Sequence, residues 1–122
     1  MPKSKVTVEQ LAKAALDLDA LQLRAVTQEF LRQNPRLSEV NRPNTNDSRE
    51  LAVAASLIEL FALRTSQHPP AWTKEIGPLP EKMYLVKASA IGSYTRRLCD
   101  TESPEPLRKR GFLAPPNFLE FL

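Results

Sequence analysis

The sequence has few of the residues from which proteins build metal and nucleotide sites. Its 122 residues include one cysteine, one histidine and three glycines. A single cysteine, Cys99, cannot form an intramolecular disulfide, which fits a reducing compartment. Cys99 and His68 cannot supply the three or four ligands of a usual zinc site, so we expect no bound metal. Gly77, Gly92 and Gly111 form no phosphate-binding pattern, so we expect no nucleotide cofactor.

Long hydrophobic runs are also missing. No stretch approaches the roughly 20 apolar residues of a membrane-spanning helix. No apolar stretch follows the basic residues at the N-terminus, as it would in a signal peptide. We therefore expect a cytoplasmic protein without a membrane segment. The formal net charge is only +3, which permits binding to nucleic acid without indicating it.

The composition is that of a folded protein without an obvious catalytic centre. Hydrophobic residues make up 42% and charged residues 25% of the chain, which is typical of a globular domain. The one histidine, His68, lies between a predicted helix and Pro69, and no nucleophile motif accompanies it. A stabilising role at the helix C-terminus is the simpler explanation. We expect no catalytic residues and no enzyme activity; an enzyme of unrecognised type is the third hypothesis.

Two helices are predicted near the N-terminus. Thr7 and Gln10 form a capping box, so the first helix should start at Val8. Asp19 favours a break before a second helix over Ala20–Gln33. Apolar residues of that second helix recur at three- and four-residue spacing, which indicates one buried face.

A third helix is predicted over residues 47–67, after a loop that is rich in asparagine and proline. Asp47 or Ser48 caps it, and Glu50 completes a capping box with Asp47. Apolar residues occupy most of the circumference of this helix. We therefore expect it at the centre of a helical bundle or in an interface between chains.

The C-terminal half contains most of the prolines. Eight of the eleven follow His68, and helices cannot run through them. We therefore expect residues 69–122 to form short elements that wrap around the helical body, with Trp72 as an anchor. Residues 81–88 are predicted as a helix, although their apolar run would also fit a buried strand.

Two short helices are predicted later in this half. The first covers about residues 93–99. The second covers residues 103–110, with Ser103 as the cap, proline in the first turn and Gly111 just past the end. Local signals agree well for this second helix, since acids lie near its start and bases near its end.

The chain ends in a strongly apolar segment. Six of the last eleven residues have large apolar side chains, and such a segment is unfavourable in water. It can complete the core of its own chain, or it can bind another protein. The candidate partner-binding residues are the aromatic ones of the proline-rich half: Trp72, Phe112, Phe118 and Phe121.

Two basic clusters give an alternative function. They comprise Arg96, Arg97, Arg108, Lys109 and Arg110. If the two short helices that carry them pack side by side, five cations share one face and could bind nucleic acid. Acidic residues lie between them, so an ordinary salt-bridged surface explains the pattern better. The first two helices could likewise form a helix-turn-helix, but an amphipathic hairpin explains them better.

Three stretches of the C-terminal half resemble a set of small uncharacterised bacterial proteins. They are Pro-Pro-Ala-Trp-Thr-Lys-Glu-Ile-Gly, Arg-Arg-Leu-Cys-Asp-Thr-Glu-Ser-Pro-Glu-Pro-Leu-Arg-Lys-Arg and Ala-Pro-Pro-Asn-Phe-Leu. That set is associated with gene pairs of toxin–antitoxin or defence type, in which a small helical protein accompanies a nucleotidyltransferase-like partner. The resemblance covers nearly half of the chain and carries no catalytic residues. It implies a non-enzymatic, partner-binding role.

These observations predict one all-α domain over residues 1–122. We expect a compact bundle of four to six helices, with a body at residues 6–68 and a proline-rich wrapping segment at residues 69–122. The predicted function is protein–protein interaction, as the small partner in a bacterial two-protein module of toxin–antitoxin type. The partner is another protein or a second copy of the chain. The alternative is a nucleic-acid-binding regulator that uses the basic C-terminal helices.

Overall fold

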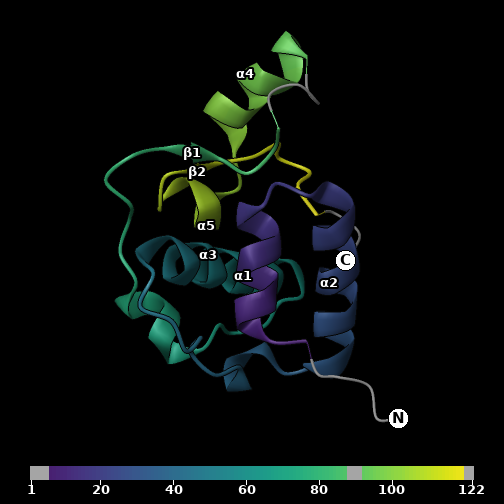
Figure 1. The fold of residues 1–122 in the computed structure, drawn as a ribbon, viewed down its shortest axis with the longest axis vertical. Helices are drawn as coiled ribbons and strands as arrows, with labels where there is room; N and C mark the ends of the chain where they lie inside the picture. The colour runs from purple at the N-terminus through teal and green to yellow at the C-terminus, as the bar shows by residue number, and fades with distance from the viewer. Residues whose placement is uncertain (1–5, 88–91, 120–122) are drawn as a thin grey trace.

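The structure, a computed structural model, describes residues 6–87 and 92–119. Within these ranges the chain forms five α-helices, two 3-10 helices and one small sheet, as Figure 1 shows. The elements are α1 (Val8–Leu16), α2 (Ala20–Gln33), η1 (Leu37–Glu39), α3 (Ser48–Arg64), η2 (Ala71–Glu75), β1 (Met83–Tyr84), α4 (Ser93–Glu102), α5 (Glu105–Arg108) and β2 (Phe112–Leu113). The predicted compact all-α class is confirmed.

The first two helices start where the local signals place them. The hydroxyl of Thr7 accepts the N–H of Gln10, and the Gln10 side chain accepts the N–H of Thr7, so the capping box is formed. Asp19 caps α2 by accepting the N–H of Gln22 at 3.1 Å. Between the helices the backbone of Leu18 adopts a left-handed conformation with φ of +57°. The turn lets α2 return alongside α1 (Figure 1).

Helix α3 lies at the centre of the fold. Every residue from 52 to 62 is buried, including Ser56 and Glu59. Helices α1 and α5 and the η2 turn all pack against α3. The nearly continuous apolar surface of α3 is thus covered on several sides, as predicted from its sequence.

The predicted helix over residues 81–88 is wrong. Residues 83 and 84 form β1, which pairs in parallel with β2, so that Met83 lies opposite Phe112 and Tyr84 opposite Leu113. The N–H of Met83 donates to the carbonyl of Gly111 at 2.8 Å. A short apolar run satisfies either pattern locally, and the partner strand, 29 residues further along the chain, decides between them.

The helix predicted over residues 103–110 is shorter than expected, covering only Glu105–Arg108, and Ser103 does not cap it. Pro104 occupies the cap position of α5. The Ser103 hydroxyl instead donates to the carbonyl of Cys99 and accepts the N–H of Ala114 at 3.0 Å. Ser103 therefore ties the end of α4 to the chain after β2. Gly111 follows α5 with φ of +90°, the left-handed conformation expected of a glycine there.

The proline-rich half is held on the helical body by side-chain hydrogen bonds. The indole Nε1–H of Trp72 donates to the carbonyl of Val40 at 2.8 Å. Arg64, at the end of α3, donates to the carbonyls of Pro116 and Phe118. The wrapping segment is therefore fastened to its own chain as far as residue 118.

Among the described residues, no helix is long and apolar enough to cross a membrane.

Candidate functional site

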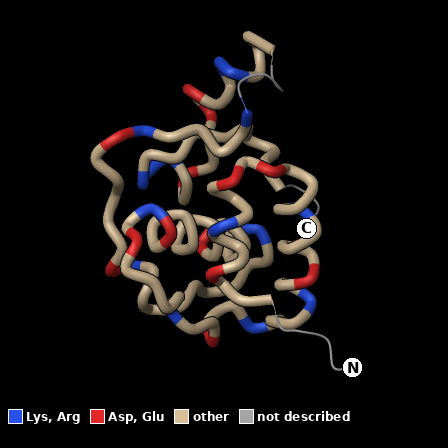
Figure 2. The backbone as a smooth tube through the Cα atoms, viewed as in Figure 1, with Lys and Arg blue, Asp and Glu red and all other residues tan. Residues whose placement is uncertain are grey.

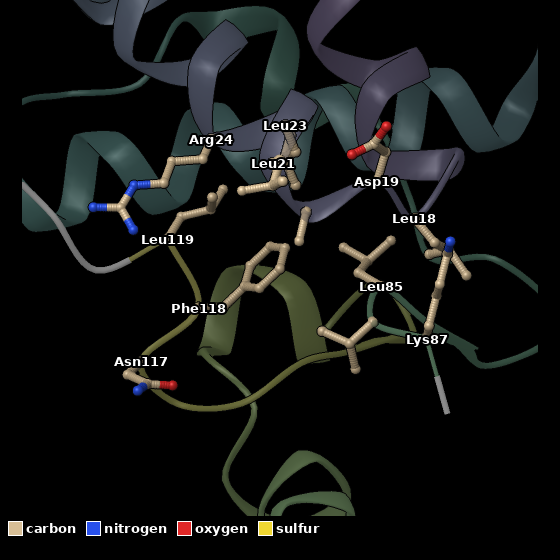
Figure 3. A pocket seen from close by; sticks show the side chains of 12 residues that line it. Leu18, Asp19, Leu21, Leu23, Arg24, Leu85, Lys87, Asn117, Phe118 and Leu119 are labelled. Atoms are coloured by element: carbon tan, nitrogen blue, oxygen red, sulfur yellow. The ribbon is translucent and has the colours of Figure 1, made fainter. Parts of the chain in front are cut away.

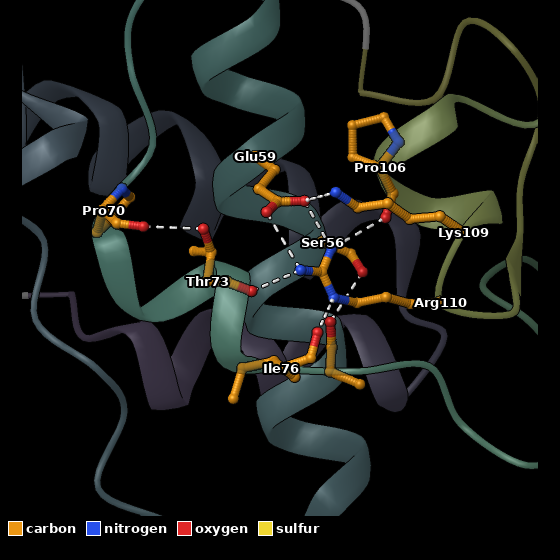
Figure 4. Close-up of polar contacts among 9 residues, drawn as sticks. Ser56, Glu59, Pro70, Thr73, Ile76, Pro106, Lys109 and Arg110 are labelled. Carbon is orange, nitrogen blue, oxygen red and sulfur yellow. Dashed lines mark hydrogen bonds and ion pairs between the residues drawn. The ribbon is translucent and has the colours of Figure 1, made fainter.

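Two features of the structure are candidates for a functional site: a buried cluster of charged side chains and an apolar groove. The first is a buried ion cluster in which α5 meets α3 (Figure 4). The guanidinium of Arg110, only 3% exposed, contacts both carboxylate oxygens of Glu59, at 2.6 and 3.2 Å. Three carbonyls complete its contacts, those of Thr73 at 2.7 Å, Ile76 at 3.1 Å and Pro106 at 3.4 Å. One side chain thus joins α3, η2 and α5.

The cluster holds structure together and has little capacity left for a ligand. A guanidinium has five N–H donors, and the five contacts of Arg110 use all of them. Lys109 adds a second cation, with Nζ at 2.8 Å from Glu59. Burial alone would raise the pKa of Glu59, but the hydrogen bonds from Arg110 and Lys109 outweigh it and hold the pKa below its ordinary value. Glu59 therefore stays ionised and is not a proton donor near neutral pH.

The second feature is an apolar groove of about 560 Å³ beside the start of α2 (Figure 3). Its lining is mostly aliphatic and aromatic. It comes from the α1–α2 turn, the segment after β1 and the turn at residues 116–119, here called the C-terminal turn. The apolar residues are Leu18, Ala20, Leu21, Leu23, Leu85, Val86, Phe118 and Leu119. In Figure 3 the ring of Phe118 lies at the centre of this hollow. The groove is large enough to receive one or two bulky apolar side chains.

The backbone around the groove is strained. The described residues include three non-glycine positions with positive φ, and two of them, Leu18 at +57° and Leu119 at +54°, line the groove. The left-handed region costs a β-carbon-bearing residue about 1–2 kcal/mol. Such strain persists only where the surrounding structure imposes it, and it gathers at functional sites. The strained backbone therefore makes this groove a stronger functional candidate than a groove of the same size without such strain.

The exposure of Leu21 is a further reason to regard the groove as a functional candidate. This side chain is 83% exposed, the highest among the large exposed hydrophobic side chains of the described residues. It lies at the edge of the groove, so cavity and protruding apolar side chain adjoin. Polar groups border them, namely Asp19, Arg24, Lys87 and Asn117. An apolar floor with a polar rim is typical of a protein interface.

The predicted partner-binding residues separate in the structure. Phe112 is completely buried, and Trp72 is half-buried with its indole N–H bonded to Val40. Both therefore serve the core of their own chain. Phe118 is half-buried and lines the groove. Phe121 lies outside the described residues.

The predicted basic face is not assembled. Arg110 is buried in the ion cluster, and Lys109 is bonded to the same carboxylate. Arg96 lies over the ring of Tyr84, 5.3 Å from its centroid, while Arg97 and Arg108 are exposed. Figure 1 shows α4 projecting away from the body and α5 lying against it, so the two helices do not pack side by side. Figure 2 shows cations and anions interspersed over the visible chain.

Other chemistry finds little support among the described residues. No group of three or more histidine, cysteine, aspartate and glutamate side chains there could hold a metal ion. Burial raises the pKa of the Cys99 thiol, and the nearby Asp100 raises it further. Cys99 is thus a neutral, buried thiol rather than an activated nucleophile.

Sequence reasoning missed both Glu59 and Leu21, although each carries a signal. Glu59 is a lone carboxylate within the buried stripe of α3, which indicates a buried cation nearby. Its partner, 51 residues away, has no local signature. Leu21 shares the polar face of α2 with Arg24 and Gln28, at spacings of three and seven residues. A leucine on an otherwise polar face can mark a contact surface, although single exposed leucines are common.

Comparison with known proteins identifies no relative. No family model matches the chain, and searches of curated proteins and of solved structures find no match. The resemblance to small proteins of toxin–antitoxin gene pairs therefore stays a prediction. The functional argument depends on the site alone.

Proposed function

We propose that this protein is a non-enzymatic interaction protein whose apolar groove binds another polypeptide. One observation carries the proposal: Leu21, 83% exposed, borders an apolar groove of about 560 Å³. Exposed leucine outside an interface gains nothing from the hydrophobic effect. Covering it together with the groove would remove a continuous apolar surface from water.

The size and lining of the groove fit a small number of anchor side chains from the partner. Each large apolar side chain that becomes fully buried contributes roughly 1.5–3 kcal/mol. Phe118 and Leu23 form part of the floor and are supported by the core of the protein. A supported floor reduces the ordering cost of binding.

The C-terminal turn contributes to the groove through Arg64. This side chain donates hydrogen bonds to the carbonyls of Pro116 and Phe118, and so keeps the Phe118 ring in the floor of the groove. Arg64 is thus a positioning residue, because it acts through Phe118. Of the aromatic residues predicted to bind a partner, Phe118 keeps that role in this proposal, as part of the groove.

The setting of this function is the predicted one: a small partner in a cytoplasmic, bacterial two-protein module of toxin–antitoxin type. The fastening of Trp72 and Phe112 to their own chain supports a binding surface other than the one these residues suggest. Nucleic-acid binding is a weaker candidate, because the burial of Arg110 and the separation of α4 from α5 remove the expected basic face.

Point substitutions test the proposal better than a deletion of the tail, which would also remove Phe118 from the groove. Affinity capture from an extract of the source organism should be compared among wild type, Leu21→Glu and Leu63→Glu. Leu63 is a matched control, because it is 65% exposed and does not line the groove. We expect a co-purifying polypeptide that wild type and Leu63→Glu retain and Leu21→Glu loses.

Direct binding completes the test. The captured polypeptide, purified, should bind wild type and Leu63→Glu with similar affinity, and Leu21→Glu at least tenfold more weakly, which corresponds to about 1.4 kcal/mol. Equal binding by all three proteins would refute a role for the groove.

A further inference from the structure

We propose that the ion pair between Arg110 and Glu59 holds one side of the groove in place, so that breaking the pair opens the groove without unfolding the helical body. That side comprises residues 85–87 and 117–119 and is here called the β side, because both segments follow strands of the small sheet. The opposite side comes from residues 18–24. The inference rests on the proposed function, to which it adds a control of the groove from within the fold.

The first segment of the β side, residues 85–87, is attached to β2 by backbone hydrogen bonds. The N–H of Met83 donates to the carbonyl of Gly111 at 2.8 Å, and the N–H of Leu85 donates to the carbonyl of Leu113 at 2.9 Å. These bonds belong to the parallel pairing of β1 with β2 and fix the end of β1 relative to β2. The first segment therefore follows any movement of β2.

The second segment, residues 117–119, is attached to β2 through the chain itself, because it follows the strand after a short connection. The N–H of Phe118 donates to the carbonyl of Pro115 at 2.9 Å and closes the turn. Arg64, at the end of α3, donates to two carbonyls of the same turn and attaches it to the helical body a second time. The second segment therefore depends less on β2 than the first segment does.

Arg110 attaches β2 to the central helix α3. Helix α5 packs against α3, and β2 packs against α5 and β1. The guanidinium of Arg110 precedes β2 closely in the chain and lies 2.6 and 3.2 Å from the carboxylate oxygens of Glu59 on α3. An unpaired charge in the interior is strongly unfavourable. When the pair breaks, the guanidinium is therefore stable only in water, and residues 110–113 move outward with it.

The opposite side of the groove does not depend on this attachment. Helices α1 and α2 pack against each other, and α1 packs against α3. In Figure 3, Leu21 and Leu23 reach into the groove from α2, and Leu85 and Phe118 reach in from the opposite side. The groove thus lies between a side that belongs to the helical body and a side that the ion pair holds. Loss of the pair separates the two sides and removes the apolar surface that they share.

Amide hydrogen exchange followed by NMR tests the inference without any partner, because it reports how often each N–H leaves its hydrogen bond. The N–H groups of Leu85 and Phe118 are the reporters, one for each segment of the β side. The N–H groups in the middle of α3 report unfolding of the whole protein. In the wild type, both reporters should exchange faster than the α3 groups, because the β side opens separately.

The test variant is Arg110→Lys, which keeps the positive charge but has three N–H donors in place of five. Exchange at Leu85 should become about tenfold faster or more, since opening no longer breaks the full set of contacts. Exchange at Phe118 should change less, because Arg64 also holds that turn. Arg108→Lys is the matched control: Arg108 lies on α5, is exposed and is not part of the ion pair, so exchange should match the wild type.

A milder variant covers the case in which Arg110→Lys does not fold. Glu59→Gln removes the negative charge but keeps one side-chain acceptor for the guanidinium. It should accelerate exchange at Leu85 more than at Phe118, as in the first variant. Unchanged exchange at Leu85 in a variant with faster exchange in α3 overturns the inference, because the pair then stabilises the whole fold without controlling the groove. Wild-type exchange at Leu85 as slow as in α3 overturns it as well.

A separate measurement distinguishes this inference from the proposed function. The polypeptide obtained by affinity capture should slow exchange at Leu85 when it is added to the wild type, because it binds only while both sides of the groove are in place. If exchange responds to Arg110→Lys but no captured polypeptide depends on Leu21, the proposed function alone fails. If capture depends on Leu21 but exchange at Leu85 does not respond to Arg110→Lys, the inference alone fails.

Discussion

The ion cluster around Arg110 and the groove beside α2 differ in how far their unusual residues are satisfied by the rest of the protein. Around Arg110 and Glu59 a full set of charges is buried, and each donor of the guanidinium has a partner. Around Leu21 an apolar side chain lies in water beside a cavity, with Leu18 and Leu119 in strained conformations. The first region is closed and satisfied, whereas the second is open. The comparison teaches that a cluster of charges need not be a binding site, because the charges of Arg110 and Glu59 stabilise the interior instead.

The largest expected effect comes from removing one partner of the buried ion pair. Arg110→Met should lower the free energy of unfolding by about 3–5 kcal/mol, because Glu59 is left buried with only Lys109 as a counter-ion. Urea denaturation measures it. The double variant Glu59→Met, Arg110→Met should be more stable than Arg110→Met alone, since no uncompensated charge remains. A double variant less stable than Arg110→Met would mean that the cluster does more than balance charge.

Acid should weaken the same region more gradually. The pKa of Glu59 is lowered in the folded state, so its stabilising contribution is complete above the unfolded value, about 4.3 for glutamate. It is lost as the pH falls through the lower folded value. Urea denaturation at pH 7, 5 and 3 should therefore show a difference between wild type and Glu59→Gln that shrinks below about pH 4. A difference that is constant with pH would contradict the buried ion pair.

A smaller effect is expected where the chain leaves α5. Gly111→Ala should lower the free energy of unfolding by about 1–2 kcal/mol, because φ of +90° disfavours a residue with a β-carbon. Steric overlap adds little, since the new carbon would meet the carbonyl of Glu81 at 3.5 Å. Thermal denaturation can follow it. Gly92→Ala is the control: its φ is −83°, so no such cost applies.

The smallest change in stability is expected at the groove. Leu21→Glu should alter the free energy of unfolding by no more than about 0.5 kcal/mol, as is usual for an exposed position. The same substitution should weaken binding of the partner at least tenfold. Chemical denaturation at low protein concentration measures the first property apart from the second. A loss comparable to that of Arg110→Met would mean that Leu21 belongs to the core and would remove the contrast between the two regions.

Local signals predicted the helices that depend on neighbours in sequence. The capping box at Thr7, the cap at Asp19 and the cap at Asp47 all formed, and α2 has the predicted bounds. Central burial of α3 also followed from its apolar circumference. Each of these properties depends on contacts within about four residues, or on one pattern repeated along a helix.

Predictions that needed a distant partner were wrong. Residues 83 and 84 form a strand because Phe112 and Leu113 lie beside them. Ser103 holds Ala114 instead of capping α5. Arg110, predicted on a salt-bridged surface or, as the alternative, on a basic one, is in the interior because Glu59 and three carbonyls from separate segments converge on it. No short window of sequence contains both members of any of these pairs.

The sequence by itself determined the all-α class, the starts of the first three helices and the central place of α3. It also contained the apolar tail, without showing which chain the tail would cover. Tertiary structure alone decided that Trp72 and Phe112 pack on their own chain, that Arg110 is buried, and that Leu21 and Phe118 meet at a groove. The physical reason is range: helix caps and amphipathic faces act between near neighbours, whereas burial and ion pairing depend on segments that meet only when the chain is folded.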